Sequence, residues 1–117
     1  MVILYTPAAG SLLTTIPSLG KEWRLVHQFK ATDYSSTTWT SSLHLTVGGD
    51  QAEQGDRTPA IFFHPVEGMM VDTAFNGTGN VNWTSLSNDT PLLDTWTVIE
   101  ISQELSDGEY HLKVLVD

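Results

Sequence analysis

The chain of 117 residues has the length of a single domain built around one core. A hydrophobic share of 40% and a low charged share of 16% exclude a disordered chain, and a net charge of −9, from 14 acidic and 5 basic residues, disfavours nucleic acid and anionic lipid as partners. The sequence contains no cysteine, which excludes disulfides and thiolate metal sites.

The N-terminal segment begins with a short apolar run, Val2–Tyr5, that is soon interrupted by prolines and a glycine. No basic residue precedes Lys21, and the apolar run is too short for a signal peptide or a membrane span. We therefore expect a strand and an extended linker over residues 1–21, followed by one folded domain over residues 22–117, with no membrane insertion.

From residue 22 onward, apolar side chains recur at every second position, which is the period of a half-buried β-strand. The pattern predicts strands at Glu22–Lys30, Ser42–Val47, Ala60–His64, Met69–Phe75, Trp96–Gln103 and Glu109–Asp117. In the second of these strands we expect Leu43 and Leu45 to point inward and His44 to point outward. Residues 77–95, rich in Asn, Ser and Thr, are expected to form a loop. With the N-terminal strand, these segments favour an antiparallel β-sandwich.

Four sequence blocks carry a resemblance to a known superfamily. They are Leu43-His44-Leu45-Thr46-x-Gly48-Gly49-Asp50, Gly55-Asp56-Arg57-x-Pro59-Ala60-Ile61, Phe75-Asn76-Gly77-x-Gly79-Asn80 and Trp96-Thr97-x-Ile99-Glu100-Ile101-Ser102-Gln103. In this order they resemble the concanavalin A-like and laminin G-like modules of secreted animal proteins, over the stretch from Trp23 to Asp117. The resemblance implies a jelly-roll sandwich that recognises glycans or extracellular proteins, often with calcium nearby, but fold analogy does not fix the ligand.

The C-terminal edge departs from that pattern. Such modules continue past the last strand with a glycine turn and closing strands, whereas this sequence stops at Val116-Asp117. An unpaired apolar edge is a template for association. We expect either that another chain supplies the closing strand, giving an oligomer or a complex, or that Val2–Tyr5 fills the edge.

Catalysis has little support in the sequence. Retaining glycosidases need two carboxylates, and the comparable strand around Val98–Ser102 carries only Glu100. The four histidines form no helical metal motif, and the sequence has no nucleophile elbow. These histidines are His27, His44, His64 and His111. We expect them to be strand-face residues, with His27 in the interior, and the protein not to be an enzyme.

An asparagine-rich segment ending in tryptophan is the candidate ligand site. Amides bridge sugar hydroxyls and aromatic rings stack on sugar C–H groups, which points to Asn76, Asn80 and Trp83. Asp72 and His44 are outlying candidates for the same site. The segment therefore has the composition of a glycan-binding loop.

The same segment contains three N-glycosylation sequons, at Asn76, Asn82 and Asn88. They predict a secreted, extracellular glycoprotein. Composition leaves two functions open for this loop, because it could bind a glycan or only carry one.

A glycine-rich acidic loop is a candidate calcium site. Its carboxylates are Asp50, Glu53 and Asp56. With backbone carbonyls they could supply the oxygen ligands that calcium prefers, and a solvated acidic turn is the alternative. The neighbouring Arg57 is expected to pair inside the domain with Asp72 or Glu100, the alternative being a carboxylate on a ligand.

These patterns predict an extracellular recognition module that binds a glycan or an extracellular protein without catalysis. No cofactor is required, although calcium could take part. The alternative is a structural subunit that joins a larger extracellular polymer or complex through edge-strand pairing.

Overall fold

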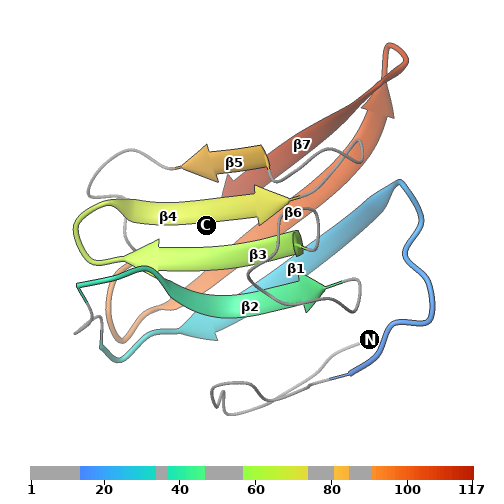
Figure 1. Ribbon diagram of the computed structural model, residues 1–117. Coiled ribbons are helices and arrows are strands. Elements are labelled where there is room, and N and C mark those ends of the chain that lie inside the picture. Colours follow the sequence, from blue (N-terminus) through green and yellow to red (C-terminus); the bar gives the residue numbers. More distant parts are fainter. Residues whose placement is uncertain (1–13, 34–36, 47–56, 74–80, 85–90) are drawn as a thin grey trace.

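The computed structural model describes residues 14–33, 37–46, 57–73, 81–84 and 91–117. All regular structure in this part of the chain is β-strand, and it contains no helix (Figure 1). The strands are β1 (Trp23–Lys30), β2 (Thr40–Thr46), β3 (Arg57–His64), β4 (Gly68–Thr73), β5 (Val81–Thr84), β6 (Trp96–Ser106) and β7 (Glu109–Val116). The all-β class expected from the sequence is confirmed.

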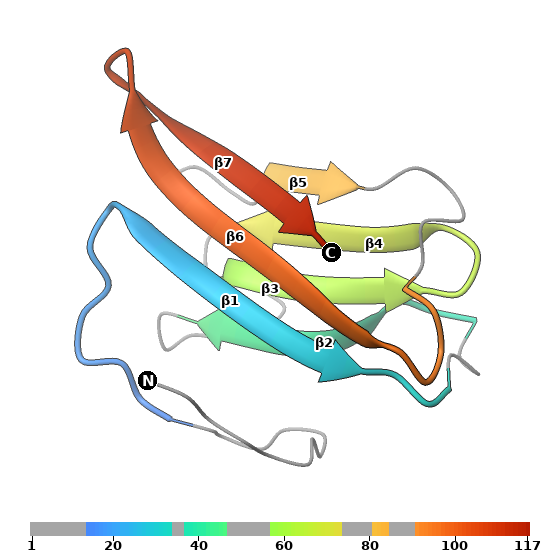
Figure 2. The same ribbon diagram turned by 180° about the vertical axis from the view of Figure 1, so that it is seen from behind.

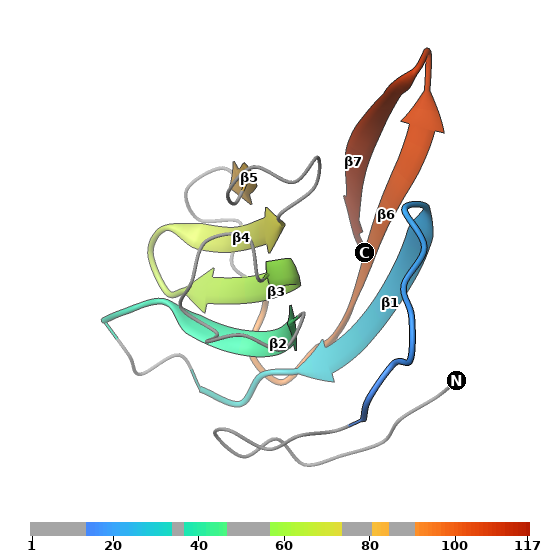
Figure 3. The ribbon, with the colours of Figure 1, turned by 45° about the vertical axis from the view of Figure 1, so that its right-hand side comes forward.

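The strands pair in two antiparallel sheets. One has the order β1-β6-β7 and the other has the order β2-β3-β4-β5. Figure 2 shows the three-stranded sheet in front of the four-stranded one. Figure 3 shows that the two sheets lie close together at one end and diverge toward the hairpin between β6 and β7.

The period-two pattern of β1 decides which face of the three-stranded sheet is covered. Trp23, Leu25, His27 and Phe29 are buried or half-buried, whereas the residues between them are exposed. Successive side chains of a strand point to opposite faces, so one face of β1 turns toward the other sheet and one toward solvent. The inward set matches the expectation from the sequence.

The core lies between the sheets. Its buried members are Ile61, Phe63, Met69 and Val71 from the four-stranded sheet and Ile99 and Ile101 from the three-stranded sheet, with Trp23, Leu25, Phe29, Leu43, Leu112 and Val114 packed around them. Phe29 meets Phe63 across the gap, with 4.7 Å between ring centroids. Because apolar burial contributes about 25 cal/mol for each Å², this cluster is the main source of stability.

Strand β2 has two shifts in its register with β3, and Leu43 and His44 lie on the faces expected from the sequence. Leu43 lies opposite Ile61 and packs against the core, whereas His44 lies opposite Ala60 on the other face. A β-bulge places an extra residue in one strand, which changes the pairing without reversing the face of every later side chain.

Strand β3 begins at Arg57, not at Ala60 as the sequence pattern predicts. Pro59 therefore lies inside a central strand, where its missing N–H would interrupt a ladder. It sits between the pairs His44–Ala60 and Thr46–Arg57, where the register with β2 shifts. The irregular pairing is what allows the strand to continue through the proline.

Strand β5 differs from the sequence pattern, which predicts a loop over residues 77–95. Val81–Thr84 pairs antiparallel with β4, and Trp83 lies opposite Val71. The strand has four residues, too few for a clear period-two signal, and its formation depends on the neighbouring strand. The predicted strand at Val2–Tyr5 lies outside the described residues, and residues 14–22 form neither strand nor helix, as expected of a linker.

His27 occupies the inner face of β1, which confirms its interior position. Its ring stacks on Phe29 with 5.5 Å between centroids, and it lies opposite Ile99 of β6. Nε2 is buried and has no hydrogen-bond partner among the described residues. Burial lowers the pKa of His27, because the charged imidazolium loses its hydration there.

This burial predicts a pH dependence of folding. The unfolded chain takes up a proton at His27 below a pH of about 6.5, whereas the folded protein resists it, so stability is complete above that pH and is lost as the pH falls toward the folded pKa. The loss is about 1.4 kcal/mol for each pH unit between the two pKa values. We expect His27→Leu to lose less stability than the wild type when urea unfolding is measured at decreasing pH.

His111→Leu is the matched control, because His111 is exposed and bonds only to the carbonyl of Ser106 among the described residues, at 3.2 Å. It should keep the acid sensitivity of the wild type. Equal slopes of stability against pH for His27→Leu and the wild type would contradict the expected cost of protonating His27.

Candidate recognition face

The outer face of the four-stranded sheet gathers polar and aromatic residues from three strands. Because directly opposed residues in an antiparallel pair share a face, the register assigns them to rows. One row contains His44, Ala60 and Asp72, one from each of β2, β3 and β4. Phe62 belongs to the next row of the same face. The opposite face of these strands is the core.

Arg57 and Asp72 form an ion pair on this face. Arg57 Nη1 donates a hydrogen bond to Asp72 Oδ2. The Arg57 side chain is 22% exposed and the Asp72 side chain 2%. The pairing within the domain that the sequence predicted for Arg57 is thus confirmed, with Asp72 and not Glu100 as its partner. The second carboxylate oxygen, Asp72 Oδ1, is buried without a hydrogen-bond partner in the described part of the chain.

The Phe62 ring packs against the Arg57 guanidinium. The guanidinium carbon Cζ lies 5.1 Å from the centre of the Phe62 ring, within the range of a cation–π interaction. His44 meets the same ring edge-on, with 6.0 Å between centroids. The aromatic face, the carboxylate and the guanidinium therefore fix one another in place.

His64 extends this arrangement along β3. Its Nδ1 accepts hydrogen bonds from the backbone N–H groups of Val66 and Glu67, at 3.2 and 3.0 Å, so its proton lies on Nε2. Nε2 then donates to the carbonyl of Thr37 at 3.1 Å. The ring also packs against Trp39, with 5.4 Å between centroids. These contacts hold His64 and Trp39 beside the turn between β3 and β4.

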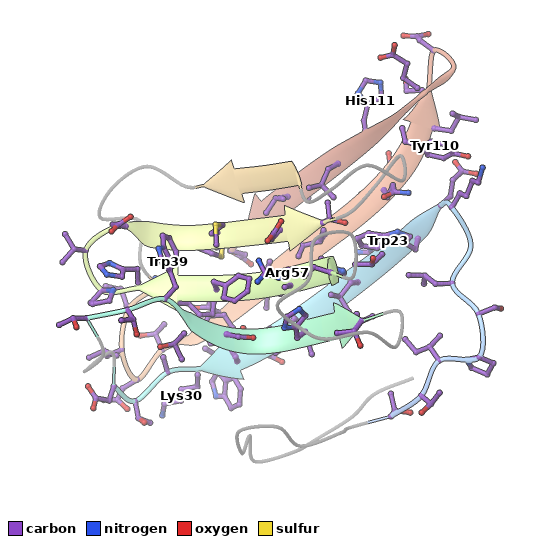
Figure 4. All side chains as sticks on the ribbon, in the orientation of Figure 1. Trp23, Lys30, Trp39, Arg57, Tyr110 and His111 are labelled. Atoms are coloured by element: carbon purple, nitrogen blue, oxygen red, sulfur yellow. The ribbon has the colours of Figure 1, made fainter. Side chains whose placement is uncertain are left out.

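We name five of these residues the β3 strip: Trp39, His44, Arg57, Phe62 and His64. All five are half-buried. Figure 4 shows the Trp39 and Arg57 side chains over the side of the four-stranded sheet that is turned away from the three-stranded sheet. The strip is thus a partly exposed aromatic surface with a fixed guanidinium.

The structure brings together two of the residues that the sequence grouped as one ligand site. His44 and Asp72 share a row on the outer face, and the backbone of Trp83 pairs with that of Val71. Asn76 and Asn80 lie outside the described residues. A site combining these residues stays a prediction.

The other predicted sites also fall mainly outside the described part of the chain. The calcium candidates Asp50, Glu53 and Asp56 and the sequons at Asn76 and Asn88 belong to residues that the structure does not describe. Asn82 lies in β5, opposite Asp72. Within the described ranges, no group of three histidines or carboxylates is arranged to hold a metal ion.

Glu100 faces the outer side of the three-stranded sheet, where it pairs with Arg24. Arg24 Nε and Nη2 donate to the two carboxylate oxygens at 2.7 and 2.6 Å. The hydrogen bond from Arg24 lowers the pKa of Glu100, against a smaller opposing effect of desolvation. Glu100 is therefore part of an exposed ion pair. The observed strand is longer than predicted and also contains Glu104, whose Oε1 accepts a hydrogen bond from Ser102 Oγ at 2.9 Å.

Sequence reasoning missed Trp39, Phe62 and His64 as members of one surface. Phe62 stands in an uninterrupted apolar run, Ala60–Phe63, which hides the alternation of its two faces. Trp39 precedes β2 in a polar segment and joins the strip only through its contact with His64. Part of this surface is predictable from the sequence. Phe62 and His64 are two positions apart, so in a strand their side chains lie on the same face.

Comparisons with protein-family models, with curated proteins and with solved structures gave no match for this chain. The resemblance to concanavalin A-like and laminin G-like modules therefore stays a prediction. A search of the described residues found no helix of the length and apolar character needed to cross a membrane.

The two ion pairs predict different costs of losing an arginine. Arg57→Ala leaves the carboxylate of Asp72 buried without its cation, and loss of one partner of a buried pair costs several kcal/mol, here about 3 kcal/mol. Arg24→Ala removes the same side chain from an exposed pair and should cost much less. Urea unfolding at neutral pH measures both changes.

The comparison also separates stability from binding at Arg57. Unchanged unfolding of Arg57→Ala, or a loss no greater than that of Arg24→Ala, would contradict the structural role of the pair and favour a role in contacting a ligand.

Proposed function

We propose that this protein is a non-catalytic recognition module whose ligand lies on the β3 strip. The supporting observation is the combination of Trp39, Phe62 and Arg57 on one sheet face, held by contacts within the domain. Side chains that are already ordered lose little entropy when a ligand binds. Such an arrangement favours recognition by a preformed surface.

The chemistry of the strip favours a glycan. Aromatic rings present a flat apolar face to the C–H patch of a sugar, and imidazole and guanidinium groups are hydrogen-bond donors for its hydroxyls. Trp39 and Phe62 supply the rings, and Arg57, whose side chain is 22% exposed, supplies the polar group. The alternative ligand is an extracellular protein with a polar surface that contacts the aromatic side chains of the strip.

The jelly-roll architecture, an extracellular location and glycosylation at the three sequons are parts of the same proposal. They rest on the block resemblance and on the sequons, with the two antiparallel sheets as support for the coarser all-β class. Sheets of this class commonly carry ligands on an exposed face or on the loops at their ends.

Binding is favoured over hydrolysis by the state of the carboxylates. Retaining glycosidases need two carboxyl groups about 5 Å apart, one of them able to act as an acid. On the described outer face of the four-stranded sheet the carboxylate is Asp72, which is buried against Arg57. A group held in this way orders its neighbours and does not reach a substrate.

A second candidate function is assembly through an edge strand. The observation that favours it is the long, regular edge of β7 in the three-stranded sheet.

Two tryptophan variants test the recognition proposal. Trp39→Ala removes a ring from the β3 strip, whereas Trp96→Ala removes a 63% exposed ring from the outer face of the other sheet. On a glycan array, the wild type and Trp96→Ala should give the same sugar-dependent signal, and Trp39→Ala should lose roughly tenfold or more in affinity, as expected when a central aromatic contact is truncated.

Circular dichroism of each variant checks that the sheets remain folded. A signal that is lost in Trp96→Ala but kept in Trp39→Ala would place the ligand on the opposite face. A signal lost only in Trp83→Ala would favour the asparagine-rich segment, and the absence of any sugar-dependent signal would contradict a glycan ligand.

A further inference from the structure

The four sheet edges of the described structure differ in how well they could pair with another strand. Strand β2 has two register shifts and β5 has four residues, and both features weaken an edge as a template. Strands β1 and β7 have eight residues each and pair with β6 without a shift. These two edges are the candidates for strand addition.

The inner faces distinguish the two long edges. On the inner face of β1 every side chain is buried or half-buried, whereas Val116 on the inner face of β7 is 48% exposed, so pairing of β7 would cover an apolar side chain. Strand β7 also contains Glu109 and Lys113 and is followed by Asp117, so antiparallel pairing of β7 with itself can oppose unlike charges.

The hydrogen bonds at the end of β7 show which of its backbone groups face outward. The N–H of Val98 donates to the carbonyl of Asp117 at 3.2 Å, and the N–H of Asp117 donates to the carbonyl of Val98 at 3.0 Å. Because N–H direction alternates along a strand, the N–H groups of Leu112, Val114 and Val116 point away from β6. No described strand pairs with this edge.

We propose that two copies of the chain associate through antiparallel pairing of their β7 strands, which joins their three-stranded sheets into one. This inference rests on the second proposed function, assembly through an edge strand, and identifies the edge and its partner. The outward N–H groups of Leu112, Val114 and Val116 would form about six hydrogen bonds across the interface. Figure 3 shows that the hairpin carrying β7 extends beyond the four-stranded sheet.

The pairing of side chains favours the register in which Val114 of one copy lies opposite Val114 of the other. In this register Leu112 lies opposite Val116, and the apolar inner face of the sheet continues across the interface. Leu112 and Val114 already pack against the core, and Val116 is 48% exposed in the single chain. Burying the exposed part of Val116 adds apolar contact to the backbone hydrogen bonds.

The outer face agrees with the same register. It opposes His111 to Asp117 and Lys113 to Leu115, so no like charges meet. A register centred on Lys113 would oppose two lysines, and Glu109 would meet Asp117, which is unfavourable.

Val116→Pro tests the pairing with little effect on the monomer. Proline removes an outward N–H, so the ladder between β6 and β7 stays intact while about two hydrogen bonds across the interface are lost. Val116→Thr is the matched control, because it keeps the N–H and the β-branched shape. Analytical ultracentrifugation of the full chain over a range of concentrations should show a dimer for the wild type and Val116→Thr, and dimerisation weakened roughly 10- to 100-fold for Val116→Pro.

Amide hydrogen exchange of the wild type gives a readout that needs no variant. The amides of Leu112 and Val114 should exchange more slowly at high protein concentration, whereas those of Lys113 and Leu115, which face β6, should not change. A wild type that stays monomeric, equal dimerisation of Val116→Pro and wild type, or exchange at Leu112 and Val114 that is independent of concentration would each overturn the proposal.

The two proposed functions can fail separately in these experiments. Trp39→Ala should dimerise like the wild type, because Trp39 lies on the other sheet. Val116→Pro should keep its sugar-dependent signal for each chain on the glycan array. Loss of dimerisation alone would leave the recognition proposal standing, and loss of the glycan signal alone would leave the strand pairing standing.

Discussion

Apolar contact between the two sheets is the constraint on which the rest of this structure depends. Ile61 and Val71 from one sheet and Ile99 and Ile101 from the other are fully buried. Because a strand turns alternate residues to opposite faces, fixing these four on the inside fixes every neighbour on the outside. The β3 strip on one sheet and the Arg24–Glu100 pair on the other are consequences of that choice.

The outer face of each sheet carries an ion pair, one exposed to water and one buried. The two pairs differ in how strongly they select one packing arrangement as well as in their effect on stability. Arg24 and Glu100 remain in contact with water, so their pairing orders little around them. Asp72 is buried, and its orientation is tied to Arg57 and through it to the Phe62 ring. A buried pair contributes little net free energy compared with apolar residues of similar volume, but its geometry discriminates against alternative packings. We infer that this pair keeps the register of β3 and β4 and the shape of the β3 strip.

The sequence predicted the features that depend on local pattern and failed where the pattern depends on distant partners. The alternation of β1 and β7 is visible because each has one covered face, and an internal pair of Arg57 with Asp72 or Glu100 was expected because cations are scarce, with the structure selecting Asp72. Strand β5 is stabilised by β4 and has no signal of its own. The contact of Trp39 with His64 joins residues 25 positions apart in sequence across a β2–β3 connection, which no local pattern encodes.

The symmetry of strand pairing determines how the two β3 strips are oriented in a dimer formed through β7. Antiparallel pairing of identical edges creates a two-fold axis perpendicular to the joined sheet, and such an axis keeps each face of that sheet on its own side. Both four-stranded sheets would then lie on the same side of the extended three-stranded sheets, so both β3 strips would face the same direction. Two weak sites that face one surface bind it with an avidity greater than either affinity, because the second contact forms at high effective concentration. Self-association through β7 would thus strengthen recognition of a multivalent glycan surface without any new contact in the site itself.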